Sequence, residues 1–165
     1  MPQAKRAHPK SFARLLGPVM DSRRLYLAQT DTTVGFLSQK SDLLAKVKNR
    51  PFTKPFLIEV VNLQKLQKFA RVPKRWKNMV RRASHTTFVY PNGQAVRVVR
   101  NEWHLRFLRR FGWMYSTSAN PSGQSFDEQW ARNQADVVVE DWRGLFEGKA
   151  SHIFKLSNQK IKKLR

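Results

Sequence analysis

The class of fold is indicated by the stretch Thr86-Thr87-Phe88-Val89-Tyr90-Pro91-Asn92-Gly93-Gln94-Ala95-Val96-Arg97-Val98-Val99. β-Branched and aromatic residues on both sides of Pro91–Gln94 favour strands, and the Asn-Gly pair accepts the positive φ angles of a hairpin turn. This stretch therefore predicts two antiparallel strands. Outside it, strand-like and helix-like segments alternate along the chain. We expect an α/β fold of the α+β-like kind, a twisted sheet of parallel and antiparallel strands with helices packed on it.

The other expected elements follow from hydrophobic spacing and from capping residues. Strands are expected at Leu25–Ala28, Phe56–Val61, Trp113–Tyr115, Val137–Val139 and Ile153–Leu156. Helices are expected at the N-cap residues Ser41, Asn62 and Asn101, and at the capping box Ser125-x-x-Glu128. Because no internal repeat or Gly/Ser linker divides the chain, we expect one domain over residues 1–165, with residues 1–20 as a less regular N-terminal segment.

Composition excludes several classes of protein. The 41% of hydrophobic residues is typical of a soluble globular domain, and the absence of cysteine excludes disulfide scaffolds, thiol catalysis and cysteine-ligated zinc. The four histidines show neither HxH nor HExxH spacing, so we expect no protein-held metal. Since no long apolar run and no apolar signal-peptide region is present, we expect a cytoplasmic protein without a membrane partner.

The charge of the chain predicts a polyanionic partner. There are 32 Lys and Arg against 11 Asp and Glu, a net charge of +21, and residues 61–101 hold no acidic residue. Such an excess attracts nucleic acid. The candidate RNA-binding residues are Lys74, Arg75, Arg81 and Arg82, with Trp76 available for stacking on a base. The alternative is a solvated basic face without a specific partner.

Three polar segments could bind a small anionic molecule. Thr30–Gly35 offers hydroxyls, an aspartate and a glycine that permits close approach. Lys48-Asn49-Arg50-Pro51 carries two cations that project together when the backbone is extended, which suits a phosphate or carboxylate. Ser116–Gly123 follows a hydrophobic strand and could form an anion-binding nest. The alternatives are a Thr-rich turn, a solvated basic patch and a polar surface loop.

In this order the three segments resemble the motifs of the YrdC/TsaC family of threonylcarbamoyl-AMP synthases. The family shows a PTDTVYGL-like stretch, a K-x-R-P segment and STSAN-x-SG, which here read Gln29–Phe36, Lys48–Pro51 and Ser116–Gly123. Thr87–Pro91 and Ala95–Val98 are similar to the family's T-F-V-x-P and A-V-R-V strands. The resemblance spans nearly the whole chain and implies a YrdC-like fold with a basic concave site, in the short bacterial form.

The resemblance also implies a reaction and its partners. Members of that family condense L-threonine, bicarbonate and ATP, which arrives with Mg²⁺, into threonylcarbamoyl-AMP and release pyrophosphate. The product goes to downstream threonylcarbamoyl-transferase proteins that modify tRNA. The attack of N-carboxythreonine on the α-phosphorus depends on positioning and on neutralisation of charge.

Individual residues receive roles from the same resemblance. Lys48 and Arg50 would be catalytic, because they would clamp the phosphates. Threonine would be held by Thr30, Arg97 and Ser151. The residues implied to contact ATP are Lys48, Arg50, Thr87, Ser118, Asn120 and Arg165.

The sequence departs from the family pattern at several positions. Gln29, Val34 and Phe36 replace the usual proline, tyrosine and leucine, and Ser84-His85-Thr86 stands where the family has Gly-Pro before its T-F-V strand. The missing Gly-Pro and the charge of +21 support an alternative hypothesis. The chain would then be a divergent, catalytically impaired family member that binds tRNA or double-stranded RNA.

Overall fold

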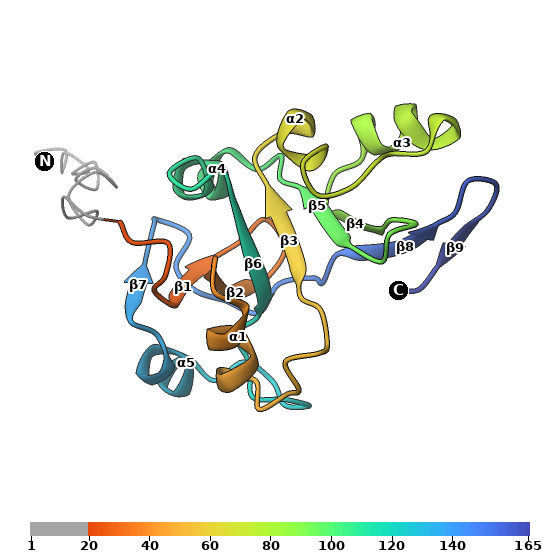
Figure 1. Cartoon of the computed structure of the whole chain (residues 1–165). Coiled ribbons are helices and arrows are strands. Elements are labelled where there is room, and N and C mark those ends of the chain that lie inside the picture. The colour runs from red at the N-terminus through yellow and green to blue at the C-terminus, as the bar shows by residue number, and fades with distance from the viewer. Residues whose placement is uncertain (1–19) are drawn as a thin grey trace, which may run out of the picture.

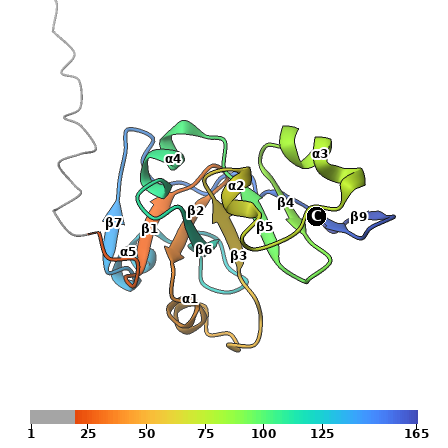
Figure 2. The same cartoon turned by 45° about the horizontal axis from the view of Figure 1, so that its top comes forward.

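The computed structural model describes residues 20–165, which form one nine-stranded sheet with short helices around it (Figure 1). The strand order is β7-β1-β2-β6-β3-β5-β4-β8-β9, and β7 and β9 lie at opposite ends of the molecule (Figures 1 and 2). The strands are β1 Tyr26–Gln29, β2 Val34–Ser38, β3 Leu57–Val60, β4 Thr86–Val89, β5 Ala95–Val98, β6 Trp113–Ser118, β7 Val137–Val139, β8 His152–Leu156 and β9 Ile161–Lys163. The helices are α1 Ser41–Val47, α2 Leu63–Leu66, α3 Lys77–Arg82, α4 Glu102–Leu108 and α5 Glu128–Gln134, and a 3₁₀ turn, η2 Lys74–Trp76, precedes α3.

The sheet mixes parallel and antiparallel strands, as the sequence predicted. Antiparallel pairs join β1 to β2, β2 to β6, β6 to β3, β5 to β4 and β8 to β9. Parallel pairs join β7 to β1, β3 to β5 and β4 to β8. The predicted hairpin is confirmed, since Phe88 lies opposite Val96 and Gly93 in the turn has a φ of 84°. The predicted fold class is therefore confirmed.

Successive side chains along a strand pack on opposite faces of the sheet. Along β1, Leu27 packs in the cluster with α1 and α5, whereas Tyr26 packs in the cluster with α4. Farther along the sheet, Ile58 of β3 packs with Leu66 of α2 and Val80 of α3. Figure 1 shows this division, with α2 and α3 beside β5 and β4 and with α1 and α5 near β2 and β7. The other face of β3, β5, β4 and β8 is left to line a pocket.

Two of the four predicted helix starts are correct. Asn62 caps α2 by accepting a hydrogen bond from the backbone N–H of Lys65 at 2.8 Å, and Asn101 caps α4 in the same way. Ser41 is not a cap but the first residue of α1. The capping box is also wrong, because Asp127 caps α5 and offers a charged acceptor to the helix N-terminus.

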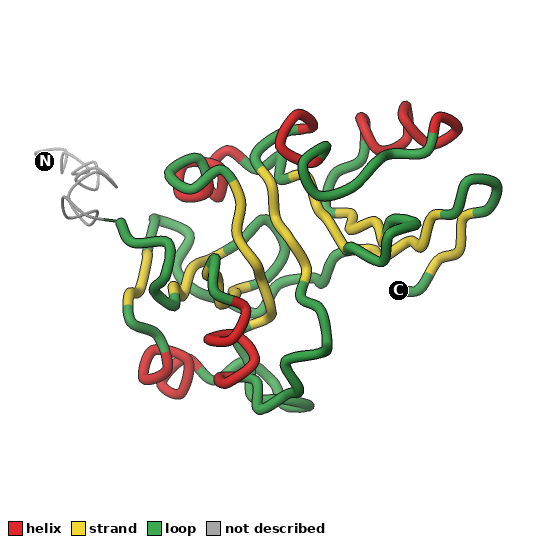
Figure 3. The backbone as a smooth tube through the Cα atoms, in the orientation of Figure 1, coloured by secondary structure: helices red, strands yellow, loops and turns green. Residues whose placement is uncertain are grey.

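Several elements had no counterpart among the expected ones, namely β2, α3 and β9. β2 is buried along its whole length, so it shows no alternation of polar and apolar residues. The predicted loop at Ser116–Gly123 begins too early, because Ser116, Thr117 and Ser118 belong to β6. Loops still make up much of the chain between the short helices and strands (Figure 3).

The N-terminal segment expected to be less regular lies, up to residue 19, outside the described residues. Within residues 20–165 the longest helices have seven residues. Every helix in that range is too short to cross a membrane.

Candidate active-site pocket

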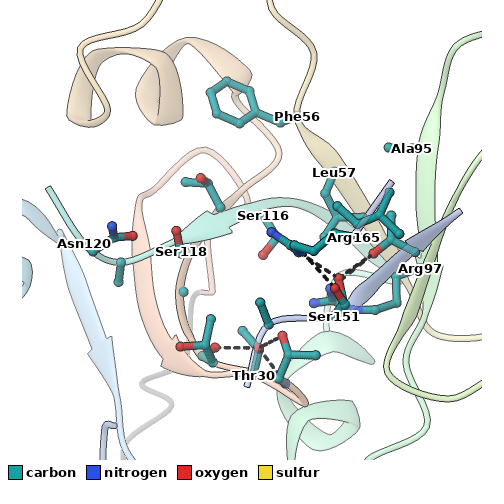
Figure 4. A pocket seen from close by; sticks show the side chains of 18 of the residues that line it. Thr30, Phe56, Leu57, Ala95, Arg97, Ser116, Ser118, Asn120, Ser151 and Arg165 are labelled. Carbon is teal, nitrogen blue, oxygen red and sulfur yellow. Dashed lines mark hydrogen bonds between the residues drawn. The ribbon is translucent and has the colours of Figure 1, made fainter. Parts of the chain in front are cut away.

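A cavity of about 530 Å³ lies against the sheet, between the β1–β2 turn, the segment after α1, the chain before β8 and the C-terminal residues after β9 (Figure 4). Its volume is in the range of small-molecule sites. Three guanidinium groups, those of Arg50, Arg97 and Arg165, and one carboxylate, that of Glu147, are among the lining groups. This excess of positive charge favours an anionic ligand.

Strand periodicity places the polar groups of the pocket floor. Side chains two residues apart on a strand point to the same face. On β5 this rule directs Ala95 and Arg97 into the pocket, and on β6 it directs Ser116 and Ser118 there. The intervening Val96 is buried in the cluster with α2 and α3. A slip of one residue in register would therefore bury these polar groups in the apolar core.

The turn between β1 and β2 forms one wall. The Thr30 hydroxyl donates to the Thr33 carbonyl oxygen at 2.6 Å and accepts from the Thr32 N–H at 3.1 Å. The chain after β7 crosses this turn, because Phe146 O accepts from the Val34 N–H at 3.2 Å and the Gly148 N–H donates to Thr33 Oγ1 at 3.0 Å. We call residues 145–151 the strap. The strap holds the threonine-rich turn in a defined shape beside the cavity.

Gly148 allows the strap to lie this close. A Cβ atom at residue 148 would stand 2.0 Å from the carbonyl oxygen of Thr32. Gln29, which replaces the usual proline of the family pattern, also secures the strap, because its Oε1 accepts from the Phe146 N–H at 2.9 Å.

Lys48 holds the loop after β6 rather than facing the pocket. Its ammonium donates to Ser118 O at 3.0 Å, to Asn120 O and to Asn120 Oδ1 at 3.2 Å. Ser122 Oγ donates in return to Lys48 O at 2.8 Å. Burial, followed by the nearby charge of Arg50, lowers the pKa of Lys48. Lys48 is not among the lining residues, while Ser118 and Asn120 are.

Arg50 does line the pocket. Its guanidinium lies 4.2 Å from the centre of the Phe56 ring and donates to Pro55 O at 2.8 Å. Burial lowers the pKa of Arg50. The expected joint projection of Lys48 and Arg50 is wrong, because Lys48 has helical backbone angles and Asn49 a φ of 46°, so the backbone is not extended. The roles of the two cations toward a phosphate stay predictions.

A second group of polar side chains meets across β4, β5 and β8. The Thr87 hydroxyl is 3.0 Å from Ser151 Oγ, and Arg97 Nη1 is 3.4 Å from Thr87 Oγ1. Arg165 donates through Nε to Ser151 O at 3.0 Å and through Nη2 to Ser151 Oγ at 3.2 Å. Figure 4 shows Arg97, Ser151 and Arg165 close together, with Ser118 and Asn120 at the other side of the cavity.

Arg97 also belongs to a buried network of charged groups. Its Nη2 pairs with Glu59 Oε1 and lies 3.1 Å from Asp31 Oδ1, and His104 Nε2 is hydrogen-bonded to Glu59 Oε2. Burial alone would raise the pKa of Glu59, but His104 and Arg97 outweigh it and bring this pKa from 4.5 to about 2. Glu59 is therefore ionised at neutral pH.

The same network has the composition of a metal site. Ligand atoms of Asp31, Glu59 and His104 all lie within 4.8 Å of one another. The Arg97 guanidinium, however, is paired with both carboxylates and supplies the positive charge that a cation would bring. The cluster is therefore a buried arginine, Arg97, that is paired with the carboxylates of Asp31 and Glu59.

Comparison with known proteins agrees with the resemblance seen in the sequence. The family model for Sua5, YciO and YrdC, which carries the description "Telomere recombination", matches residues 27–165. The chain belongs to the Sua5/YciO/YrdC family. A search of curated proteins finds no match.

Solved structures share the YrdC-like fold at low sequence identity. Sua5 of P. abyssi complexed with L-threonine has a TM-score of 0.69 at 19% identity, over 86% of this chain and 50% of that one. E. coli YciO has a TM-score of 0.70 at 17% identity, over 87% of this chain and 83% of that one. T. kodakarensis HypF has a TM-score of 0.65 at 14% identity, over 87% of this chain and 22% of that one. This chain thus spans about half the length of the Sua5 it matches.

The departures from the Sua5/YciO/YrdC pattern have visible structural consequences beside the pocket. His85, which stands where the family pattern has Gly-Pro, adopts a φ of 48°, a conformation that favours glycine. Its carbonyl oxygen accepts from the His152 N–H at 3.0 Å, at the start of the pairing between β4 and β8. The pairing of β4 with the β8 segment, beside Thr87 and Ser151, therefore begins without the Gly-Pro that is usual in the family.

The candidate RNA-binding residues are separate from the pocket. Lys74 and Arg75 lie in η2, and Arg81 and Arg82 lie in α3, all four exposed to solvent and none in the pocket lining. Trp76 is half-buried, and its Nε1–H donates to Ser157 O at 2.8 Å, which ties η2 to the β8–β9 turn. Because the ring is half-buried and held by this hydrogen bond, Trp76 is less available for stacking on a base than we expected from the sequence.

Two groups beside the site, Glu59 and His104, were not predicted from the sequence. Glu59 is the one acid in the otherwise apolar stretch Phe56–Val61 of an acid-poor chain, which was a usable signal. His104 lies in α4, three residues after its N-cap Asn101, and its contact with Glu59 depends on how α4 packs on the sheet.

Proposed function

We propose that this protein is an L-threonylcarbamoyladenylate synthase, which condenses L-threonine, bicarbonate and ATP to threonylcarbamoyl-AMP and pyrophosphate. One observation carries the proposal. Of the side chains expected to bind ATP or threonine, all except Lys48 line one cavity, although they come from segments far apart in the sequence. These are Thr30, Arg50, Thr87, Arg97, Ser118, Asn120, Ser151 and Arg165.

The first step forms the carbamate of threonine. The ammonium group of threonine and bicarbonate give N-carboxythreonine, water and a proton, so that a nitrogen–carbon bond forms. In the proposed arrangement threonine lies against Thr30, Arg97 and Ser151, and the guanidinium faces the negative charge of the amino acid. The strap and the β1–β2 turn restrict the orientation of the amine, which lowers the entropy lost in the reaction.

The second step transfers the adenylyl group. A carbamate oxygen attacks the α-phosphorus, a new oxygen–phosphorus bond forms, and the bond to the β-phosphate oxygen breaks as pyrophosphate leaves with the electron pair. Arg50 and Arg165 would neutralise the charge that builds up on the phosphates. Ser118 and Asn120 would position the nucleotide. The geometry supports an indirect role for Lys48, which holds the loop that carries both residues.

Magnesium enters as a part of the nucleotide substrate. Glu147 supplies the one carboxylate of the pocket lining, and its Oε2 already accepts from the Phe126 N–H at 3.2 Å. Phosphate oxygens and water would therefore provide most of the ligands, as is usual for Mg²⁺ bound with nucleoside triphosphates.

The test is pyrophosphate release by the purified protein with ATP, Mg²⁺ and bicarbonate, with and without L-threonine. We expect release that requires threonine and bicarbonate and that is much weaker with serine or valine. Arg50→Ala is expected to abolish release. Folded protein that gives no threonine-dependent release, beside an active control enzyme, would contradict the proposal.

A second candidate function, binding of tRNA or double-stranded RNA, is favoured by a different observation. Residues 61–101 and 148–165 contain no Asp or Glu, and the order β5-β4-β8-β9 brings these two segments together at one end of the sheet. Among the ion pairs of residues 20–165, Arg97 is the one member from these segments. Shallow grooves at this end are lined by Arg71, Lys74 and Arg75 together with Asn92 and Asn158. Unpaired cations around a groove suit a phosphate backbone.

This second function is tested by the salt dependence of binding to a short RNA duplex. Replacing Lys74, Arg75, Arg81 and Arg82 by alanine should weaken binding and reduce the slope of log K against log salt by about 1 for each phosphate that is no longer neutralised. A matched control replaces four other exposed cations instead, namely Lys40, Lys46, Arg106 and Arg110. Equal slopes for the parent and the fourfold variant would show that RNA does not bind at this end.

A further inference from the structure

An ionised acid stands in the middle of β3, directly beneath the pocket. Glu59 is 0% exposed, and its Cα is the register partner of Arg97 on β5 and of Met114 on β6. Because paired residues on neighbouring strands point to the same face, the carboxylate of Glu59 is directed toward the guanidinium of Arg97. The register of the sheet thus determines this contact.

The two oxygens of Glu59 have different partners. Oε1 accepts from Arg97 Nη2, and Oε2 is hydrogen-bonded to His104 Nε2. An ionised carboxylate can only accept hydrogen bonds, so Nε2 of His104 must carry the proton. His104 is itself placed by the start of α4, where the side chain of Asn101 accepts from the His104 backbone N–H at 3.1 Å.

Asp31 Oδ1 lies 3.1 Å from the same Nη2 atom, close enough for an ion pair but without a hydrogen bond. The side chains of Arg97 and Asp31 are 4% and 1% exposed, so water screens this cluster very little. Nη1, in contrast, is directed toward Thr87 of the pocket lining. The buried acids therefore hold the guanidinium at Nη2, and Nη1 is left at the ligand side.

We propose that Glu59 and His104 are positioning residues, which hold the Arg97 guanidinium in the orientation needed to bind the carboxylate of the amino-acid substrate. The identity of that substrate as threonine rests on the proposed function. Glu59 and His104 do not line the pocket and act through Arg97. An arginine already hydrogen-bonded to Glu59 and paired in charge with Asp31 loses little freedom when a ligand binds, which strengthens binding by preorganisation.

The experiment compares two variants of His104 with a control in the same helix. His104→Leu removes the donor to Glu59, while His104→Gln can keep an N–H at a similar place. Leu108→Ala removes apolar packing from the cluster of α4 without removing a polar group of the network. The affinities of each variant for L-threonine and for ATP are measured by calorimetry.

We expect His104→Leu to weaken threonine binding roughly tenfold or more, since small displacements of a positioning group have effects of this size. Its affinity for ATP should stay within about twofold of the parent, His104→Gln should restore most of the threonine affinity, and Leu108→Ala should change neither affinity. An equal loss of affinity for threonine and for ATP in His104→Leu, or an unchanged affinity for threonine in that variant, would overturn the proposal.

A readout without substrate separates this inference from the proposed function. NMR of isotope-labelled arginine side chains reports rotation of the Arg97 guanidinium, and the signal is assigned by its loss in Arg97→Lys. The parent should show slow rotation and His104→Leu fast rotation. If the parent binds no threonine while this difference is seen, the proposed function fails and the positioning role stands. Equal rotation in both proteins would refute the positioning role.

Discussion

Replacing Gly148 by alanine should disrupt the wall of the pocket. The new Cβ would stand 2.0 Å from Thr32 O, whereas Cβ atoms in proteins essentially never come closer than 3.0 Å to a non-bonded heavy atom, so the strap must move by about 1 Å. This movement would strain the hydrogen bond from the Gly148 N–H to Thr33 Oγ1 and the one from the Val34 N–H to Phe146 O.

The size of the effect follows from these contacts. Overpacking costs about 1–3 kcal/mol, and each strained hydrogen bond adds about 1 kcal/mol at most. A loss of about 2–4 kcal/mol lowers the Tm of a protein of this size by roughly 5–15 °C. Since a displacement of about 1 Å at a reacting centre can lower the rate about a hundredfold, threonine-dependent pyrophosphate release should fall by one to two orders of magnitude.

The assay combines thermal unfolding with pyrophosphate release at a temperature where every variant is folded. Gly144→Ala is the matched control, because residue 144 lies just before the strap, has a φ of 70° and has no atom within 4 Å of the added Cβ. It should lose about 1 kcal/mol from the unfavourable φ and keep its activity. A Gly148→Ala protein with the Tm and the activity of the parent would refute the close contact between the strap and the β1–β2 turn.

Three further predictions concern the charged groups. Lys48→Met should lower the free energy of unfolding by about 2–4 kcal/mol in urea denaturation, because it leaves the acceptors of Ser118 and Asn120 without their buried donor, and an unchanged stability would contradict this role. Arg50→Ala should instead abolish pyrophosphate release with a change in stability of less than about 1 kcal/mol, since its hydrogen bonds are to carbonyl groups in a partly exposed loop, and full activity would remove Arg50 from the site. The pKa of Glu59 is lowered from 4.5 to about 2 in the folded protein, so its ionised form stabilises the fold above pH 4.5, and this contribution is lost as the pH falls through 4.5 toward 2. Glu59→Gln should flatten the dependence of unfolding free energy on pH in that window, and an unaltered dependence would show that Glu59 has an ordinary pKa.

Elements with a local cause were predictable from the sequence. The hairpin depends on the turn residues Asn92 and Gly93, and the starts of α2 and α4 depend on single asparagine side chains, so each could be found in a short window. The polar motifs were recognised through their resemblance, in order along the chain, to those of the Sua5/YciO/YrdC family. Their meeting in one cavity follows from the sheet order.

The remaining features depend on contacts between distant segments. β2 is buried on both faces, and β9 pairs with β8 at the edge of the sheet, so neither has a clear pattern of its own. The ammonium of Lys48 is directed to a loop some seventy residues away, and His104 meets Glu59 across forty-five residues. Gly148 is needed because of a carbonyl oxygen on another turn. Such contacts are set by tertiary packing, and a short stretch of sequence gives no information on them.

The central claim is that the pocket joins threonine, bicarbonate and ATP in one product. The most direct measurement is mass spectrometry of the reaction of the purified protein with isotopically labelled bicarbonate, L-threonine and Mg²⁺-ATP. We expect a labelled threonylcarbamoyl-AMP in amounts equal to the pyrophosphate released, and no such product from Arg50→Ala. Pyrophosphate without the labelled adduct, or no product from folded parent protein, would contradict the account.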